Sequence, residues 1–101
     1  MIVLHAEVPI APEHREDALE TIRDLVEQSR AEEGMIDYRA TTDVEEPNTV
    51  RFFEHYEDEA AMEAHLETDH YRSFAKSLPE WLAGEPEVLK FEVGEVTELE
   101  R

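Results

Sequence analysis

Residues 49–66 read TVRFFEHYEDEAAMEAHL, and within them a strand pattern changes into a helix pattern at Asp58. Residues 49–57 are rich in β-branched and aromatic side chains, which favours a strand. Asp58 is a suitable N-cap because its carboxylate can accept a hydrogen bond from a backbone N–H of the first helical turn, where Glu59 also suits the helix dipole. The stretch therefore predicts a strand followed at once by a helix that contains His65.

On the C-terminal side, the sequence predicts a second helical piece and then a strand. Thr68 or Asp69 would cap a helix that contains His70, and Pro79 is expected to interrupt this helix because proline lacks a backbone N–H. A loop at residues 84–86 then precedes a last strand, predicted over residues 88–96.

On the N-terminal side, a strand over residues 2–8 precedes an amphipathic helix that begins near Pro12 and is stopped by Gly34. Residues 35–42 and 49–57 would form a hairpin around a turn at residues 45–48. The order β-α-β-β-α-β is that of a ferredoxin-like α+β fold, a four-stranded antiparallel sheet with both helices on one face. We expect a single domain over residues 1–101.

The sheet face without helices is predicted to have a mixed character. Val3 and His5 would share it with Val88, Lys90 and Glu92 of the last strand. A half-apolar open face in a small domain is a candidate interface, so we expect a homodimer.

The composition is strongly acidic, with 27 Asp and Glu against 9 Lys and Arg, for a net charge of -18. This balance argues against nucleic acid and against an acidic membrane surface as partners, because both require clustered basic residues. Acidic residues spread along the whole chain are typical of a halophile's protein. With no cysteine, no signal peptide and no run that would span a membrane, we expect a cytoplasmic protein.

His65 and Glu54 are the leading candidates for chemistry. The helical spacing places His65 toward the sheet, where it is either a core histidine with one hydrogen bond or a base or donor in a cavity. Glu54 shares a strand face with Phe52, and a carboxylate on an apolar face needs a partner. That partner is His65 if the face looks toward the helices; a structural pair with Arg39 or Arg51 is the alternative.

A metal site is not expected. On a continuous helix, the five-residue spacing of His65 and His70 separates them by about 140°, although a break at Thr68 would bring them back together. The aromatic residues have two interpretations: Tyr38 is a core ring or a phenolic donor, and the others pack the core or stack on a flat substrate. These others are Phe52, Tyr71, Phe74, Trp81 and Phe91. The three isolated glycines form no phosphate-binding loop, so we expect no flavin or nicotinamide cofactor.

Several segments resemble the antibiotic biosynthesis monooxygenase domain family. They are residues 33–38 (EGMIDY), 54–56 (EHY), 60–66 (AAMEAHL) and 70–71 (HY), together with Phe74. The resemblance extends over roughly residues 2–96. It implies a dimeric α/β barrel of the kind that includes cofactor-free quinol monooxygenases, haem-degrading enzymes and an isomerase.

With this resemblance, we interpret the chain as a cofactor-independent monooxygenase that uses dioxygen on a small aromatic quinol or polyphenol. His65 would be the base or donor, Tyr38 and His70 donors near the substrate oxygen, and Glu54 the group that orients His65. The alternative is a non-catalytic dimeric α/β-barrel binding or stress-response protein. A haem-degrading enzyme is disfavoured because the first strand carries His5 rather than an Asn, and an isomerase of phosphorylated molecules because no basic cluster exists.

Overall fold

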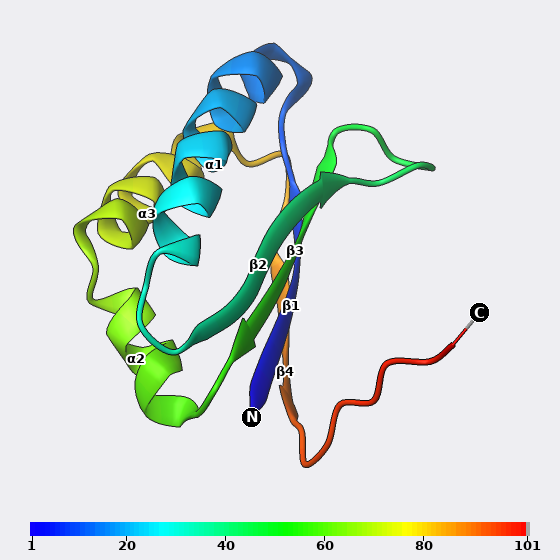
Figure 1. Ribbon diagram of the computed structural model, residues 1–101. Helices are drawn as coiled ribbons and strands as arrows, with labels where there is room; N and C mark the ends of the chain where they lie inside the picture. Colours follow the sequence, from blue (N-terminus) through cyan, green and yellow to red (C-terminus); the bar gives the residue numbers. More distant parts are fainter. Residues whose placement is uncertain (101) are drawn as a thin grey trace.

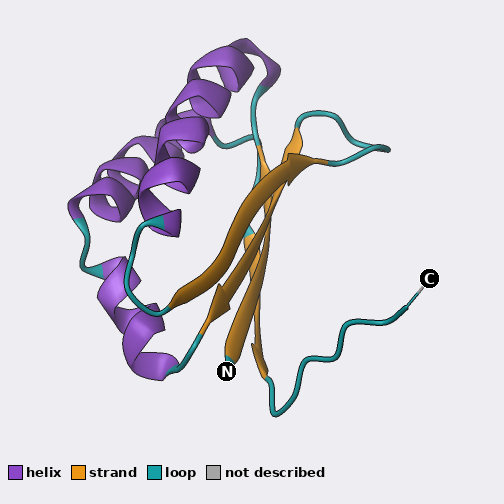
Figure 2. Ribbon diagram, in the orientation of Figure 1, coloured by secondary structure: helices purple, strands orange, loops and turns teal. Residues whose placement is uncertain are grey.

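Three helices cover one face of a four-stranded antiparallel sheet and leave the other face bare (Figures 1 and 2). This is a computed structural model, and it describes residues 1–100. Its elements are β1 (Ile2–Pro9), a 3-10 turn (Pro12–His14), α1 (Arg15–Arg30), β2 (Met35–Thr42), β3 (Thr49–Tyr56), α2 (Glu59–Leu66), α3 (Asp69–Trp81) and β4 (Glu87–Glu92). The strand order is β2-β3-β1-β4. The predicted ferredoxin-like α+β arrangement is confirmed.

Local signals explain where α2 and α3 begin. The Asp58 side chain accepts a hydrogen bond of 2.8 Å from the backbone N–H of Ala61, as predicted for an N-cap. Of the two candidates for the second cap, it is Thr68 that is used, since its Oγ1 accepts from the backbone N–H of Tyr71 at 3.2 Å. The two helices are therefore separate segments with a change of direction between them.

Gly34 closes the turn between α1 and β2. Its φ is +84°, a backbone conformation that costs free energy for any residue with a Cβ. A Cβ built on it would lie 2.7 Å from the Cβ of Ala61 in α2. The turn and helix α2 are thus in close contact, and this contact requires the absence of a side chain.

The hydrophobic core lies between the helices and the inner face of the sheet. Its sheet side includes Ala6, Val8, Val50 and Phe52, and its helix side is contributed by α1 and α3, with Ala18, Ile22, Leu25, Phe74 and Trp81. Burial of these side chains supplies most of the driving force for folding, at about 25 cal/mol per Å² of apolar area. The aromatic core residues contact one another edge to face, as in the pair Phe52–Phe74, whose ring centroids are 5.8 Å apart.

Two predicted boundaries are wrong. The last strand ends at Glu92 rather than at residue 96, because its partner β1 begins at Ile2 and only the hydrogen bonds between Met1 and Val93 continue the pairing. Helix α3 is not interrupted by Pro79 but continues to Trp81. Pro79 lies in the last turn, where few later residues depend on the disturbed ladder.

The open face of the sheet is more apolar than the sequence pattern predicted. In the observed register Leu89 pairs with His5 and Phe91 with Val3, and directly paired residues share a face. Leu89 and Phe91 therefore lie on the open face, and the expected Val88 and Lys90 do not. Phe53 of β3 joins them there, since it pairs with His5 on the other side of β1.

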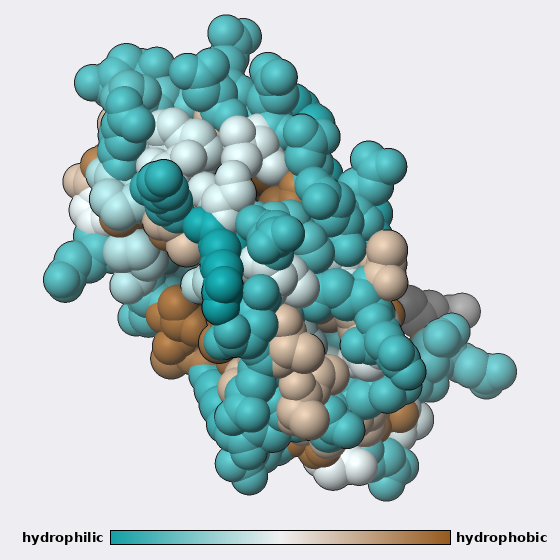
Figure 3. Space-filling model, turned by 90° about the vertical axis from the view of Figure 1, so that its left-hand side faces the viewer, coloured by the Kyte–Doolittle hydropathy of each residue, from teal (hydrophilic) through white to brown (hydrophobic). Residues whose placement is uncertain are grey.

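The opposite, helix-bearing surface is mostly hydrophilic, with small apolar patches between the charged residues (Figure 3). Over residues 1–100, no helix combines the length and the apolar character needed to span a membrane.

Candidate functional site

The side chain of His65, a residue of α2, is buried on the side of the helix that faces the sheet. Its side chain is only 1% exposed, and its Nδ1 lies 2.7 Å from Oε2 of Glu32. A carboxylate can only accept, so Nδ1 donates this hydrogen bond. When the ring is neutral, its lone pair is consequently on Nε2, the nitrogen that points away from Glu32.

Glu32 is the residue that the sequence analysis did not find. It lies on the turn between α1 and β2, and its Oε2 also accepts a hydrogen bond of 2.6 Å from Nε2 of His70. Nothing in the sequence distinguishes it from the other acidic residues except its place two residues before the turn glycine Gly34. The geometry makes Glu32 the common partner of both histidines.

His65 and His70 converge because α2 and α3 are separate helices. The helix break before Thr68 removes the divergence expected for a continuous helix, and the two imidazole centroids are 6.1 Å apart. Thr68 contributes to this geometry in two ways, since it caps α3 and its Oγ1 donates to the carbonyl of His65 at 2.7 Å.

Three tyrosine rings surround His65. The centroids of Tyr38, Tyr56 and Tyr71 lie 5.3, 5.9 and 5.1 Å from that of the imidazole. Nε2 of His65 is fully buried and has no hydrogen-bond partner among the described residues. A buried polar nitrogen without a partner is uncommon and costs free energy, so it is a candidate for a functional role.

Glu54 occupies the inner face of the sheet, but it does not bind His65. It accepts a hydrogen bond of 2.5 Å from the hydroxyl of Tyr56. The alternative partners are also occupied elsewhere: Arg39 bonds Asp37 at 2.9 Å and Arg51 bonds Asp43 at 2.6 Å. In this geometry Glu32, rather than the predicted Glu54, is the carboxylate that is hydrogen-bonded to His65.

Burial raises the pKa of Glu54 above its ordinary value; the nearby Glu32 acts in the same direction, while the Tyr56 hydrogen bond and His65 oppose the change. Burial, followed by the charge of Glu54, likewise raises the pKa values of Tyr38 and Tyr56 far above the usual range. The two phenols therefore stay protonated and can act only as hydrogen-bond donors or acceptors near neutral pH.

We predict that Glu54→Gln makes the protein more stable at neutral pH than the native chain. A raised pKa in the folded state means that Glu54 stabilises the fold below its unfolded pKa of about 4.5, and that this contribution is lost as pH rises through the folded value. Glutamine removes this loss and still offers an oxygen to Tyr56. Denaturant unfolding between pH 4 and 7 should show the advantage of the variant growing with pH; the control Glu20→Gln, on an exposed site of α1, should show no such trend.

The remaining predicted site residues lie mostly in the core. Phe52, Phe74 and Trp81 are buried against one another and belong to the hydrophobic cluster. Of the rings expected to contact a substrate, Tyr71 is the one that is only partly buried. The core interpretation of these aromatic residues accounts for the first three.

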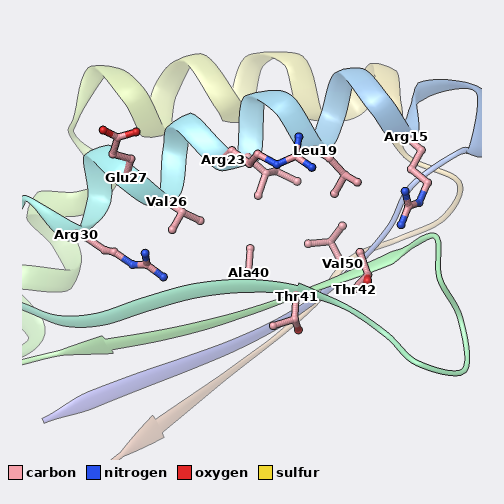
Figure 4. Close-up of a pocket in the computed structure, with 11 residues that line it drawn as sticks. Arg15, Leu19, Arg23, Val26, Glu27, Arg30, Ala40, Thr41, Thr42 and Val50 are labelled. Carbon is pink, nitrogen blue, oxygen red and sulfur yellow. The ribbon is translucent and has the colours of Figure 1, made fainter.

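A groove of about 860 Å³ lies between α1 and the β2 edge of the sheet (Figure 4). Apolar side chains line it, among them Leu19, Val26 and Ala40, and Arg15, Arg23 and Arg30 lie along its helix side. At its end, Nε of Arg30 donates to the backbone carbonyl of Tyr38 at 2.9 Å. The groove thus ends beside the strand residue that contacts His65. Sequence analysis did not predict it, because its lining combines residues from three separate segments.

Comparisons with known proteins agree on one family. Residues 1–77 match the family model described as antibiotic biosynthesis monooxygenase. The chain is 41% identical over 95 residues to a Bacillus subtilis (strain 168) protein named "Putative monooxygenase YcnE", covering 94% of this chain and 100% of that protein.

Solved structures show the same fold. A crystal structure of an antibiotic biosynthesis monooxygenase is 25% identical, with a TM-score of 0.88, and the match covers 94% of this chain and 100% of the other. The Pseudomonas aeruginosa protein PA3566 is 28% identical with a TM-score of 0.85, over 93% and 94% of the two chains. The names of the relatives support a monooxygenase-like role, and the chain belongs to the antibiotic biosynthesis monooxygenase family.

Proposed function

We propose that this protein is a cofactor-independent monooxygenase that oxidises a small aromatic quinol or polyphenol with dioxygen. The observation that carries the proposal is the buried, unpartnered Nε2 of His65, whose ring is fixed by Glu32 through Nδ1. A carboxylate on Nδ1 keeps the lone pair on Nε2 and stabilises the positive charge that the ring acquires when it takes a proton. His65 is therefore the base.

The substrate itself would supply the electrons. Once His65 takes the phenolic proton, the electron-rich phenolate reduces dioxygen and forms a bond between a ring carbon and oxygen. Cleavage of the O–O bond leaves one oxygen atom on the ring as a carbonyl, and the other leaves as water with the two hydrogens that the substrate loses. The protein needs to provide a base, donors for the developing oxyanion and a site that excludes water. Tyr38 and His70 are the proposed donors.

The groove beside α1 is the proposed place of entry. Its volume of about 860 Å³ falls within the usual range for small-molecule sites. Its three arginines are a third of the basic residues of a chain with a net charge of -18, and a guanidinium there can donate a hydrogen bond to the hydroxyl oxygen of an entering phenol before His65 takes the proton. From its end at Arg30, a ring would reach His65 after a movement of Tyr38 or of the less buried Tyr71.

The test is oxygen consumption by the purified protein with a panel of quinols and polyphenols, in about 2 M KCl to screen the acidic surface. Dioxygen uptake with formation of a quinone and water, without peroxide release, is the expected result. Binding of the same compounds without any uptake would instead identify a non-catalytic binding protein, for which the close packing around His65 is the favouring observation. If the protein shows neither oxygen uptake nor binding of these compounds, both functions are refuted.

We also propose that two copies associate through the open face of the sheet, as the dimeric barrel requires. Phe53, Leu89 and Phe91 of this face are 39%, 45% and 47% exposed, although they are large and apolar.

Light scattering in molar salt should give twice the chain mass of 11.7 kDa. Phe91→Glu should give the monomer, because it would bury an unpaired charge at a cost of several kcal/mol. Val44→Glu, at an apolar residue of the β2–β3 loop that is 97% exposed and belongs to no strand of the sheet, is the control and should stay dimeric. A monomeric native chain would rule the interface out.

A further inference from the structure

Glu32, His65 and His70 form a compact cluster of potential metal ligands. One carboxylate oxygen and two imidazole nitrogens lie within 4.8 Å of one another. The three side chains are 12%, 1% and 16% exposed, so this is a built, largely buried arrangement rather than a chance meeting on the surface. Two imidazoles and a carboxylate are a donor set that suits zinc and other divalent transition ions.

The distances require little movement for an ion to enter. The two imidazole nitrogens are 2.7 and 2.6 Å from the same oxygen atom, Oε2 of Glu32. Ligand atoms around a tetrahedral ion with bonds of 2.0–2.1 Å are about 3.3 Å apart. The carboxylate would therefore withdraw by less than about 1 Å, and the two imidazole nitrogens, which lie within 4.8 Å of one another, would adopt the same spacing as the ion takes the place of the two protons that now connect the three groups.

The three ligands come from three different elements. Glu32 is placed by the turn that Gly34 closes, His65 by helix α2, and His70 by the first turn of α3 after its Thr68 cap. His70 also borders a surface cavity of about 150 Å³ that Asp24 and Phe74 help to line. This cavity gives solvent access to His70, the most exposed of the three ligands. The overall charge of -18 favours cation entry.

We propose that Glu32, His65 and His70 bind one divalent transition-metal ion of the zinc type, with water completing the coordination. Coordination through Nδ1 forces the ring proton of His65 onto Nε2, which then has no lone pair. The metal-bound form and the form in which His65 is a base are therefore mutually exclusive, and the ion acts as an inhibitor. Binding itself does not depend on the proposed function, because it is measured without turnover.

The experiment uses the native chain after chelator treatment, in about 2 M KCl so that surface carboxylates do not retain ions. Titration with Co²⁺ should give one visible d–d spectrum per chain that saturates at one equivalent, and Zn²⁺ should displace it. Ring-nitrogen NMR in the presence of Zn²⁺ should shift the signals of His65 and His70 and leave those of His5, His14 and His55 unchanged. Shifts confined to those three histidines, or no saturable spectrum, would overturn the proposal without any variant.

Variants provide the second readout. His70→Ala and Glu32→Gln should each weaken Co²⁺ binding by more than about 100-fold, beyond the loss seen when only an outer-shell partner is removed. His14→Ala, at a histidine outside the cluster, should bind Co²⁺ like the native chain. Equal binding by the native chain and His70→Ala would show that the ion sits elsewhere.

Discussion

Replacing His65 with alanine is expected to lower the rate of oxygen consumption by about 10²- to 10⁴-fold, the range that a positioned general base contributes. The proposed function leaves no other base beside the substrate, since Tyr38 and Tyr56 stay protonated and Glu54 is hydrogen-bonded to Tyr56. The measurement is the initial rate of dioxygen uptake with the best quinol of the panel, at saturating substrate, so that the change appears in kcat.

Controls separate the loss of the base from loss of structure. His65→Gln keeps a polar side chain of similar size but has no basic nitrogen, and it should be as inactive as the alanine variant while keeping the native circular dichroism spectrum. His14→Ala should be fully active. Glu32→Gln keeps an acceptor oxygen for Nδ1 but loses the charge, so it should lower kcat less than the His65 variants and alter its pH profile. Normal turnover by both His65 variants would refute the assignment of the base.

The second large effect concerns stability. Gly34→Ala should lower the free energy of unfolding by about 2–6 kcal/mol, because it combines a positive φ, at about 1–3 kcal/mol, with overpacking of similar size. Its new Cβ would be built 2.7 Å from that of Ala61. For a domain of this size the melting temperature would fall by roughly 10–30 °C. Thermal unfolding followed by circular dichroism measures this.

The other two glycines are matched controls. A Cβ at Gly84 would meet only Pro9 at an ordinary 3.5 Å, and one at Gly94 would meet nothing within 4 Å. Both alanine variants should therefore melt close to the native temperature. Adding Ala61→Gly to Gly34→Ala removes the close contact but not the backbone strain, so it should restore part of the lost stability. Because a glycine at position 61 costs helix α2 about 1 kcal/mol by itself, the comparison is with the single variant Ala61→Gly. If Gly34→Ala costs as much in that background as in the native chain, the conformation of Gly34 accounts for the whole effect.

The fold could be predicted from the sequence because its signals are local. Asp58 and the strand before it define the change from β3 to α2, and the periodicity of apolar residues defines the order of elements. The error at Pro79 is local, since the proline lies in the last turn of α3. The errors in β4 arose because the outcome depends on a partner far along the chain. The end of β4 is set by the first residue of β1, and its register decides that Leu89 rather than Val88 faces outward.

The candidate site was predictable only in part for a related reason. His65 stands out as a histidine on the buried side of a short helix, and the structure places it as expected, facing the sheet. Its partner is set by tertiary approach: Glu32 lies 33 residues earlier, on a turn whose path the sequence pattern does not determine. Glu54 is closer to His65 in the sequence, but its carboxylate accepts a hydrogen bond from Tyr56, the next residue of β3 on the inner face.

The shortness of α2 has a consequence for the local opening of the structure around His65. His65 belongs to a helix of only eight residues, joined to a sheet whose ladders are far more extensive. Short helices open locally at a lower free-energy cost than central strands. Each such opening would carry the imidazole away from Glu32 and let solvent or an aromatic guest reach the tyrosines, while the sheet stays intact. On the proposed function, this fluctuation is a second way for the buried base to meet a substrate, beside the movement of Tyr38 or Tyr71.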